Sequence, residues 1–71
     1  MAQSIRFKFS KKLRALRLKH GLSQQKLAEL ADIDYKHLQR LESKKPTDAK
    51  LETVEKLAKA FKITPSKLLD F

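Results

Sequence analysis

The stretch GLSQQKLAELADIDYKHLQRLE, residues 21–42, decides the fold of this 71-residue chain. Ser23 is a good N-cap residue, with an apolar residue before it and another at the fourth helical position, as in a hydrophobic staple. The same pattern recurs around Asp34, and between the two lies Asp32, a residue type that tolerates a left-handed backbone. The stretch therefore predicts a helix, a sharp turn and a second helix. The side chains expected in their shared core are Leu27, Ala28, Leu30, Ile33, Leu38 and Leu41.

The second of these helices has an outer face that suits DNA. At about 100° per residue, Leu38 and Leu41 point toward the core, whereas Lys36 and Arg40 point away from it beside a phenol and an amide. This face carries no acid, and Arg, Lys and Gln are the side chains that read base edges in a major groove. The alternative is an ordinary solvated helix face, although such faces usually mix both signs of charge.

The charge of the chain also favours a polyanionic partner. Lys and Arg number 17 against 8 Asp and Glu, which gives a formal net charge of +9. Residues 1–20 contain seven of these cations and no acid, which suggests phosphate contacts or an arm that enters a DNA groove, with plain solubility as the alternative. The seven cations are Arg6, Lys8, Lys11, Lys12, Arg14, Arg17 and Lys19.

Composition argues against an enzyme. The chain has no cysteine, two histidines and one glycine, so we expect no disulfide, no Gly-rich phosphate loop, no metal site and no cofactor. A domain of this length has only a small core, and dimerisation would help to stabilise it. There is neither a long apolar run nor an apolar N-terminal segment, so we expect a soluble intracellular protein.

The segment before the central stretch is expected to form an arm and one helix. Residues 5–9 alternate apolar and basic side chains, which is a strand signal. We expect residues 1–8 either to pair with a second copy or to lie extended over the core. Ser10 is the expected N-cap of the first helix, and Gly21 stands where a helix end favours a left-handed residue.

Two more helices are expected after the central stretch. Asp48 is the expected cap of a helix that runs to about residue 62. Its buried stripe would consist of Leu51, Val54, Leu57, Ala58 and Phe61. Thr64 then caps a short last helix, with Pro65 at its first position. The sequence thus predicts one all-α domain over residues 1–71, with a basic arm (1–8) and a helical bundle (9–69).

Several motifs together resemble the phage repressor and Cro family of helix-turn-helix regulators, also called the XRE family. They are the Leu-Ser-Gln start at Leu22, the Leu-Ala pair at Leu27, the Leu-x-x-Leu-Glu ending at Glu42 and the run LETVEKLAKA from Leu51. The resemblance covers about residues 9–69. It implies a compact five-helix bundle of the lambda-repressor-like type that binds double-stranded DNA, usually as a dimer.

Carried over by position, the resemblance implies roles for individual residues. Gln24 would touch a phosphate and brace a recognition side chain, and Arg17 would pair with Glu42. The residues implied to contact bases are Tyr35, Lys36, Gln39 and Arg40. Those expected to contact phosphates are Ser23, Gln24, Gln25, Lys26, His37, Ser43, Lys44 and Lys45.

The sequence is best interpreted as a sequence-specific transcriptional regulator. We expect a homodimer on a pseudo-palindromic operator, in the cytoplasm of a prokaryote or encoded by a phage, with RNA polymerase or another protein as a further candidate partner. Apolar residues near the C-terminus are expected to form the dimer interface: Phe61, Ile63, Leu68, Leu69 and Phe71. The alternative is an antitoxin-like interaction protein for which DNA binding is secondary.

Overall fold

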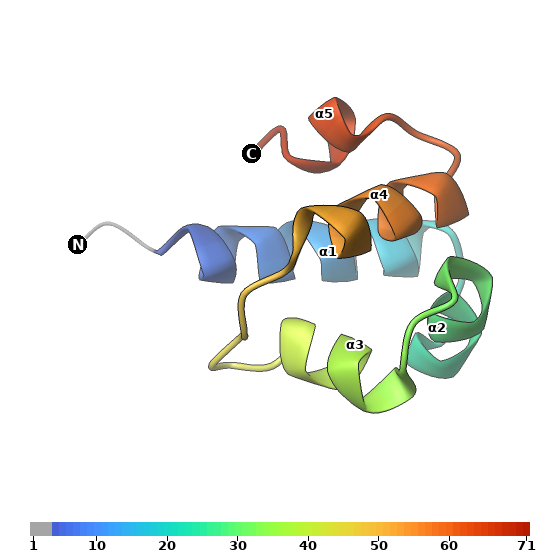
Figure 1. Ribbon diagram of the computed structural model, residues 1–71, viewed down its shortest axis with the longest axis horizontal. Helices are drawn as coiled ribbons and strands as arrows, with labels where there is room; N and C mark the ends of the chain where they lie inside the picture. Colours follow the sequence, from blue (N-terminus) through green and yellow to red (C-terminus); the bar gives the residue numbers. More distant parts are fainter. Residues whose placement is uncertain (1–3) are drawn as a thin grey trace.

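The computed structural model describes residues 4–71 and places five helices in this part of the chain, with no strand among them. The helices are α1 (Ile5–Lys19), α2 (Gln24–Ala31), α3 (Tyr35–Leu41), α4 (Leu51–Ala60) and α5 (Pro65–Leu68). Helix α3 lies on one side of α1 and α4, and α5 lies on the other (Figure 1). The predicted all-α bundle of five helices is therefore confirmed.

The helix-turn-helix forms as the sequence predicts. The Ser23 hydroxyl accepts a hydrogen bond from the Lys26 backbone N–H at 3.0 Å and caps α2. Asp32 ends α2 in the left-handed region, at φ 56° and ψ 48°. Asp34 occupies the N-cap position of α3, but its side chain forms no capping hydrogen bond. The sharp reversal after α2 consequently depends on the backbone of Asp32 more than on the cap of α3.

Helix α1 begins earlier than expected, and the strand expected over residues 5–9 is wrong. Ser4 is the N-cap, because its hydroxyl accepts from the Phe7 backbone N–H at 3.2 Å. Ser10, the expected cap, lies inside the helix and is only 5% exposed. A helix satisfies its own backbone hydrogen bonds, whereas a lone strand needs a partner strand, and residues 4–71 contain none. Of the predicted arm, residues 1–3 lie outside the described residues.

Helix α4 begins later than expected, and Asp48 is not its cap. Lys50 occupies the N-cap position and forms no side-chain capping bond. Asp48 instead pairs with Arg6 of α1, whose Nη2 donates to Oδ2 at 3.0 Å. Leu51, expected in the buried stripe, is 84% exposed because it stands in the first turn, beyond the end of the core.

The turns after α1 and α4 both contain a residue with a left-handed backbone, and the sequence predicted only the first of them. Gly21 adopts the expected left-handed backbone, at φ 65°. Lys62 does the same at φ 59° after α4, where no residue type signals it. The backbone N–H of Ile63 donates to the Ala58 carbonyl at 3.0 Å, which closes the end of α4. The chain then enters α5, where Thr64 caps as predicted and accepts from the Lys67 N–H at 3.2 Å.

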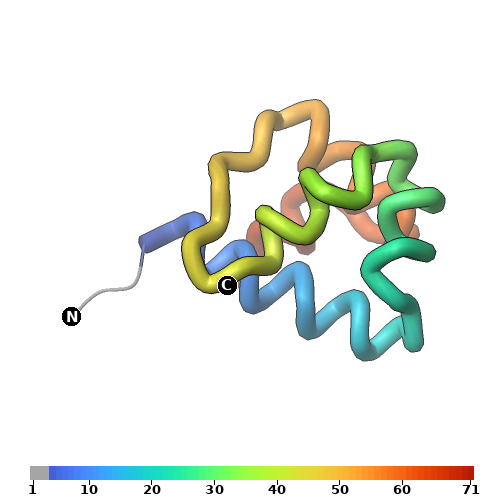
Figure 2. Tube along the Cα trace, turned by 90° about the horizontal axis from the view of Figure 1, so that it is seen from below, coloured from blue at the N-terminus to red at the C-terminus, as the bar shows by residue number. Residues whose placement is uncertain are grey.

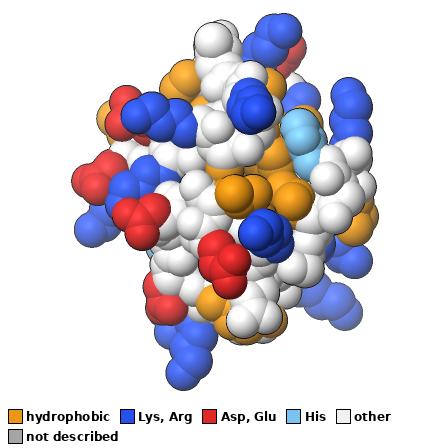
Figure 3. Space-filling view, turned by 90° about the vertical axis from the view of Figure 1, so that its right-hand side faces the viewer, with side chains coloured by type: hydrophobic (Ala, Val, Ile, Leu, Met, Phe, Trp, Pro, Cys, Tyr) orange, Lys and Arg blue, Asp and Glu red, His pale blue; other side chains and the backbone are white. Residues whose placement is uncertain are grey.

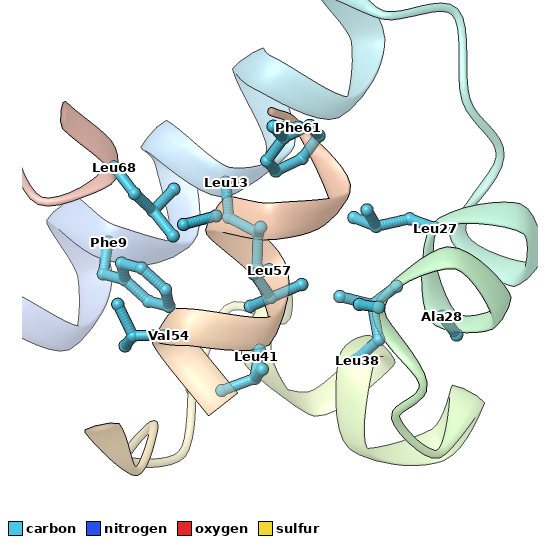
Figure 4. Close-up of a cluster of buried hydrophobic side chains, with 12 residues drawn as sticks. Phe9, Leu13, Leu27, Ala28, Leu38, Leu41, Val54, Leu57, Phe61 and Leu68 are labelled. Carbon is cyan, nitrogen blue, oxygen red and sulfur yellow. The ribbon is translucent and has the colours of Figure 1, made fainter. Parts of the chain in front are cut away.

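The hydrophobic core is one cluster to which every helix contributes. Leu57 of α4 lies in the middle of it, between side chains of α1 and α3 (Figure 4). Leu30 was expected in this core, but it is 51% exposed and does not pack against the cluster. The buried apolar residues are Phe9, Leu13, Leu27, Ala28, Ala31, Leu38, Leu41, Val54, Leu57, Ala58, Phe61 and Leu68.

The contrast between Leu38 and Leu30 gives a direct test of the core. Leu38→Ala removes a side chain with no exposed surface and leaves a cavity, so we expect the free energy of unfolding to fall by about 2–5 kcal/mol. Urea denaturation followed by circular dichroism measures the change.

Leu30→Ala is the matched control, with an expected change within about 0.5 kcal/mol. Equal losses for the two variants would contradict this assignment of the core.

Candidate nucleic-acid interface

The outer face of α3 presents four polar side chains to solvent. Lys36, Gln39 and Arg40 are exposed, and Tyr35 is 41% exposed, whereas Leu38 on the opposite face is fully buried. Neither Lys36 nor Arg40 takes part in an ion pair within residues 4–71. These groups keep their donors for a ligand, and a short helix that projects long cationic and amide side chains fits the width of a major groove.

The predicted ion pair between Arg17 and Glu42 forms, and both side chains are almost completely shielded from solvent. Arg17 Nε lies 2.9 Å from Glu42 Oε2 and Nη2 lies 3.0 Å from Oε1, with side-chain exposures of 11% and 2%. Arg17 Nη1 also donates to the Leu22 carbonyl at 2.9 Å. One guanidinium thereby joins α1 to the residue before the α2 cap and to the C-cap of α3.

Gln24 completes this cluster from the start of α2. Its Nε2 donates to Glu42 Oε1 at 3.2 Å. In the structure Gln24 thus braces the C-terminal end of α3, and the expected brace on a recognition side chain stays a prediction. The sequence pointed to Arg17 and Glu42 but not to this third partner, nor to the Leu22 carbonyl. A Gln at the first position of α2 is too common a residue to signal it.

The residues expected to contact phosphates fall on two segments beside α3. At the start of α2, Ser23, Gln25 and Lys26 are exposed, although the Ser23 hydroxyl already serves as the cap and Lys26 Nζ lies 3.9 Å from Glu29. His37 of α3 is half-buried.

The other segment is the loop after α3. Lys44 and Lys45 are exposed there, and the Ser43 hydroxyl donates to the Arg40 carbonyl at 2.8 Å, which shapes the end of the helix. Figure 2 shows α3 and this loop together on the face turned to the viewer, in front of α1. The structure thus brings the loop lysines and the outer face of α3 to one side of the molecule.

The end of the molecule formed by α2 and the adjoining ends of α1 and α4 carries both signs of charge, unlike the outer face of α3. Figure 3 shows acidic and basic side chains interspersed there around exposed apolar groups. Two of the ion pairs, Lys26 with Glu29 and Lys56 with Glu52, belong to α2 and α4. Mixed charge of this kind is typical of a solvated surface, in contrast to the acid-free outer face of α3.

Two of the five residues expected at a dimer interface are buried in the protomer itself. Phe61 is 2% exposed and Leu68 has no exposed surface, so their side chains serve the core. Ile63 is half-buried against the core. Leu69 and Phe71, at 42% and 46% exposed, keep apolar surface available to a partner.

The sequence and the fold both match known proteins. The helix-turn-helix family matches residues 13–68, which includes α2, α3 and the whole of α4. The chain belongs to the XRE-type helix-turn-helix family. It is a DNA-binding transcriptional regulator that recognises a specific sequence.

Two similar proteins are described as controller proteins. Control protein C.BamHI of Bacillus amyloliquefaciens is 36% identical over 72 residues, which cover 100% of this chain and 88% of that protein. The crystal structure of the restriction-modification controller protein C.AhdI from Aeromonas hydrophila matches with a TM-score of 0.82 at 36% identity, over 89% of this chain and 94% of that one. Within residues 4–71, no helix is long and apolar enough to cross a membrane.

The buried pair predicts a large stability effect at Glu42. Glu42→Ala leaves the guanidinium of Arg17 buried without its carboxylate, so we expect the free energy of unfolding to fall by about 3–5 kcal/mol. Chemical denaturation of the purified variant measures the loss.

Glu52→Ala, which breaks the exposed pair with Lys56, is the matched control and should cost no more than about 1 kcal/mol. A Glu42 variant as stable as this control would show that the cluster does not hold the helices together.

Proposed function

We propose that this regulator binds as a homodimer to an inverted-repeat operator, with α3 of each subunit in successive major grooves. The observation that carries the proposal is the outer face of α3: four exposed polar side chains, none of them acidic, on a helix held by the Arg17–Glu42 cluster. Buried supports restrict the orientation of α3, and a reading helix needs a defined orientation to discriminate bases.

Within this proposal, Arg40 and Lys36 read base edges, with Tyr35 and Gln39 at their sides. Arg40 is the candidate for a guanine, because its guanidinium can donate to O6 and N7 together. It stands in the last turn of α3, and its side chain has no acidic partner within residues 4–71.

Phosphate contacts flank these base contacts. Lys44 and Lys45 would reach the backbone from the loop after α3, and Ser23, Gln25 and Lys26 from the start of α2. Gln24 keeps one amide N–H for a phosphate, because Nε2 has two donors and Glu42 takes one. His37 and Ser43 lie between these groups along the chain. Such contacts position the protein and supply most of the affinity.

The biological role that we propose is control of restriction-modification genes in a prokaryotic cytoplasm. Two relatives support it, since one is described as a control protein and the other as a restriction-modification controller protein. A regulator of this kind would act at the promoter of its own system, and contact with RNA polymerase would follow from an operator placed beside that promoter.

Selection from a random duplex pool tests the proposal. We expect an inverted repeat with half-sites about one helical turn apart, bound ~10³-fold or more tightly than a scrambled duplex at physiological salt. Fluorescence anisotropy over a salt series gives both affinities. If no motif emerged and affinity simply fell with salt, α3 would not be a base reader.

The Arg40→Ala variant tests whether Arg40 contacts a base or only adds positive charge that attracts any DNA. We expect a loss of about 1–3 kcal/mol on the selected operator and little change on random DNA, because a base contact is made only at the cognate site. The measurement is anisotropy on both duplexes.

Lys44→Ala removes one positive charge as well and is the matched comparison. It should weaken both complexes and reduce the slope of log affinity against log salt by about one unit. Equal losses on both duplexes for Arg40→Ala would reassign Arg40 to the DNA backbone.

A further inference from the structure

We propose that the outer face of α1 binds a second segment of duplex DNA, separate from the segment assigned to α3. We call this surface the α1 lysine face, and it consists of Lys8, Lys11, Lys12 and Lys19. The inference goes beyond the function proposed above, because it depends neither on base reading by α3 nor on the homodimer. It gives each protomer two surfaces for DNA.

The structure separates the cations of α1 into two groups. Arg6 and Arg17 form ion pairs with Asp48 and Glu42. By contrast, five cations of the helix have no acidic partner within residues 4–71: Lys8, Lys11, Lys12, Arg14 and Lys19. Helices α2 and α4 each pair one lysine with a glutamate of the same helix, as a solvated surface usually does. Helix α1 therefore retains a positive charge that the fold does not compensate.

The α1 lysine face lies on the side of the helix opposite the core. At about 100° per residue, its four members fall within an arc of about 100° that faces away from the fully buried Leu13. Three of them are exposed, and Lys12 is half-buried. They extend over about 16 Å of the helix axis at about 1.5 Å per residue. Since one DNA strand carries a phosphate about every 3.4 Å along the duplex, the face can meet several phosphates.

Three lysines of this face surround a hollow. Lys8, Lys11 and Lys12 line it together with Ala15 and Phe71, so its lining contains three cations and no anion. Ala15 contributes only a methyl group, which leaves room for a phosphate between the lysines. Each lysine brings a compact charge with three hydrogen-bond donors.

The arrangement of these lysines costs α1 stability. Lys8 precedes Lys11 by three residues and Lys12 by four, and like charges at these spacings repel each other on a helix. The first turn of α1 contains no acid, although an acid there would interact favourably with the helix dipole. Conflicts of this kind between local preference and fold are expected at functional sites. The lysines thus indicate a polyanionic ligand and not a role in the fold.

The composition of the α1 lysine face favours DNA over an acidic protein. Lysine is depleted at the centres of protein–protein interfaces, which are apolar, whereas it commonly contacts DNA phosphates. The only apolar residues that line the hollow are Ala15 and Phe71. The chain also belongs to a DNA-binding family, so DNA is present where the protein acts.

The α1 lysine face and the outer face of α3 are turned in different directions. Leu13 of α1 and Leu38 of α3 approach Leu57 from different sides of the core (Figure 4). On α1, the side turned toward the end of α3 carries Arg17, which pairs with Glu42. The body of α1, about 10 Å across, therefore separates a straight duplex on α3 from the lysine face. The second segment is then either the flank of a bent duplex or a separate duplex.

Capture of a second duplex tests the inference. A short biotinylated duplex is held on streptavidin beads and loaded with protein, and a fluorescent duplex of different sequence is then added. We expect the intact chain to retain the fluorescent duplex. The triple variant Lys8→Gln, Lys11→Gln, Lys19→Gln should retain at least ~10-fold less per bound protein, because each substitution removes one phosphate contact and its counterion release.

A second triple variant is the matched control. Lys59→Gln, Lys62→Gln and Lys67→Gln remove the same charge from exposed lysines outside α1. This variant should retain the fluorescent duplex as the intact chain does. All six lysines are exposed, so circular dichroism should show an unchanged fold for both variants. Equal losses for the two variants would overturn the inference, since net charge and not the α1 lysine face would then be responsible.

The length of the duplex distinguishes the two sources of the second segment. If the flank of the same duplex is bound, the intact chain should gain more affinity from a longer duplex than the α1 variant does, as measured by fluorescence anisotropy. Capture of the fluorescent duplex identifies a separate duplex instead. If the intact chain and the α1 variant behaved alike in both experiments, the inference would be rejected.

The Arg40→Ala variant distinguishes failure of this inference from failure of the proposed function. It should still capture the second duplex, whereas the α1 variant should keep the preference for the selected operator. If the intact chain showed capture but no sequence preference, base reading would be wrong and the α1 lysine face right. The reverse pattern would retain base reading and reject the α1 lysine face.

Discussion

The ion pair between Arg17 and Glu42 is the interaction on which the placement of α3 against α1 and α2 depends. It is almost fully removed from water, and it links three helix ends: the last turns of α1, the start of α2 through Leu22 and Gln24, and the C-cap of α3. A buried pair is expensive to desolvate, and an apolar contact of equal volume could stabilise the bundle as well. Its particular contribution is direction, because the hydrogen bonds of a guanidinium and a carboxylate hold the elements they join in one orientation.

The surface of the protein divides into regions of different charge, and the division matches the functions proposed for them. The outer face of α3, with Lys44 and Lys45 just after it, carries cations without acids, whereas α2 and α4 carry mixed pairs. A formal net charge of +9 favours a polyanionic partner. The acid-free face of α3 is where the proposed function places that partner.

Much of the fold could be predicted from residues that lie close together in the sequence. The caps at Ser23 and Thr64, the left-handed Asp32 and Gly21, and the pair between Arg17 and Glu42 all appear as expected, the last through the resemblance to the family. The errors lie where local signals were ambiguous. Five alternating residues at the start of α1 suggested a strand because a period of two over so short a window cannot exclude a helix. Asp48 looked like a cap, but Arg6 is distant in sequence and offers it a better partner.

The sequence alone determined the kind of molecule: an all-α DNA-binding regulator with a capped helix-turn-helix, whose second helix has a cationic outer face. Those properties are local, since caps, turns and the two faces of a helix depend on residues a few positions apart. Only the tertiary structure decided which apolar residues face solvent. Leu51 and Leu30 share the spacing of core residues, yet both are exposed, because burial depends on where the neighbouring helices end. The hollow between the first turns of α1, the start of α4 and the C-terminal residues is lined by residues up to 66 positions apart, Ile5 to Phe71, and no local pattern could bring them together.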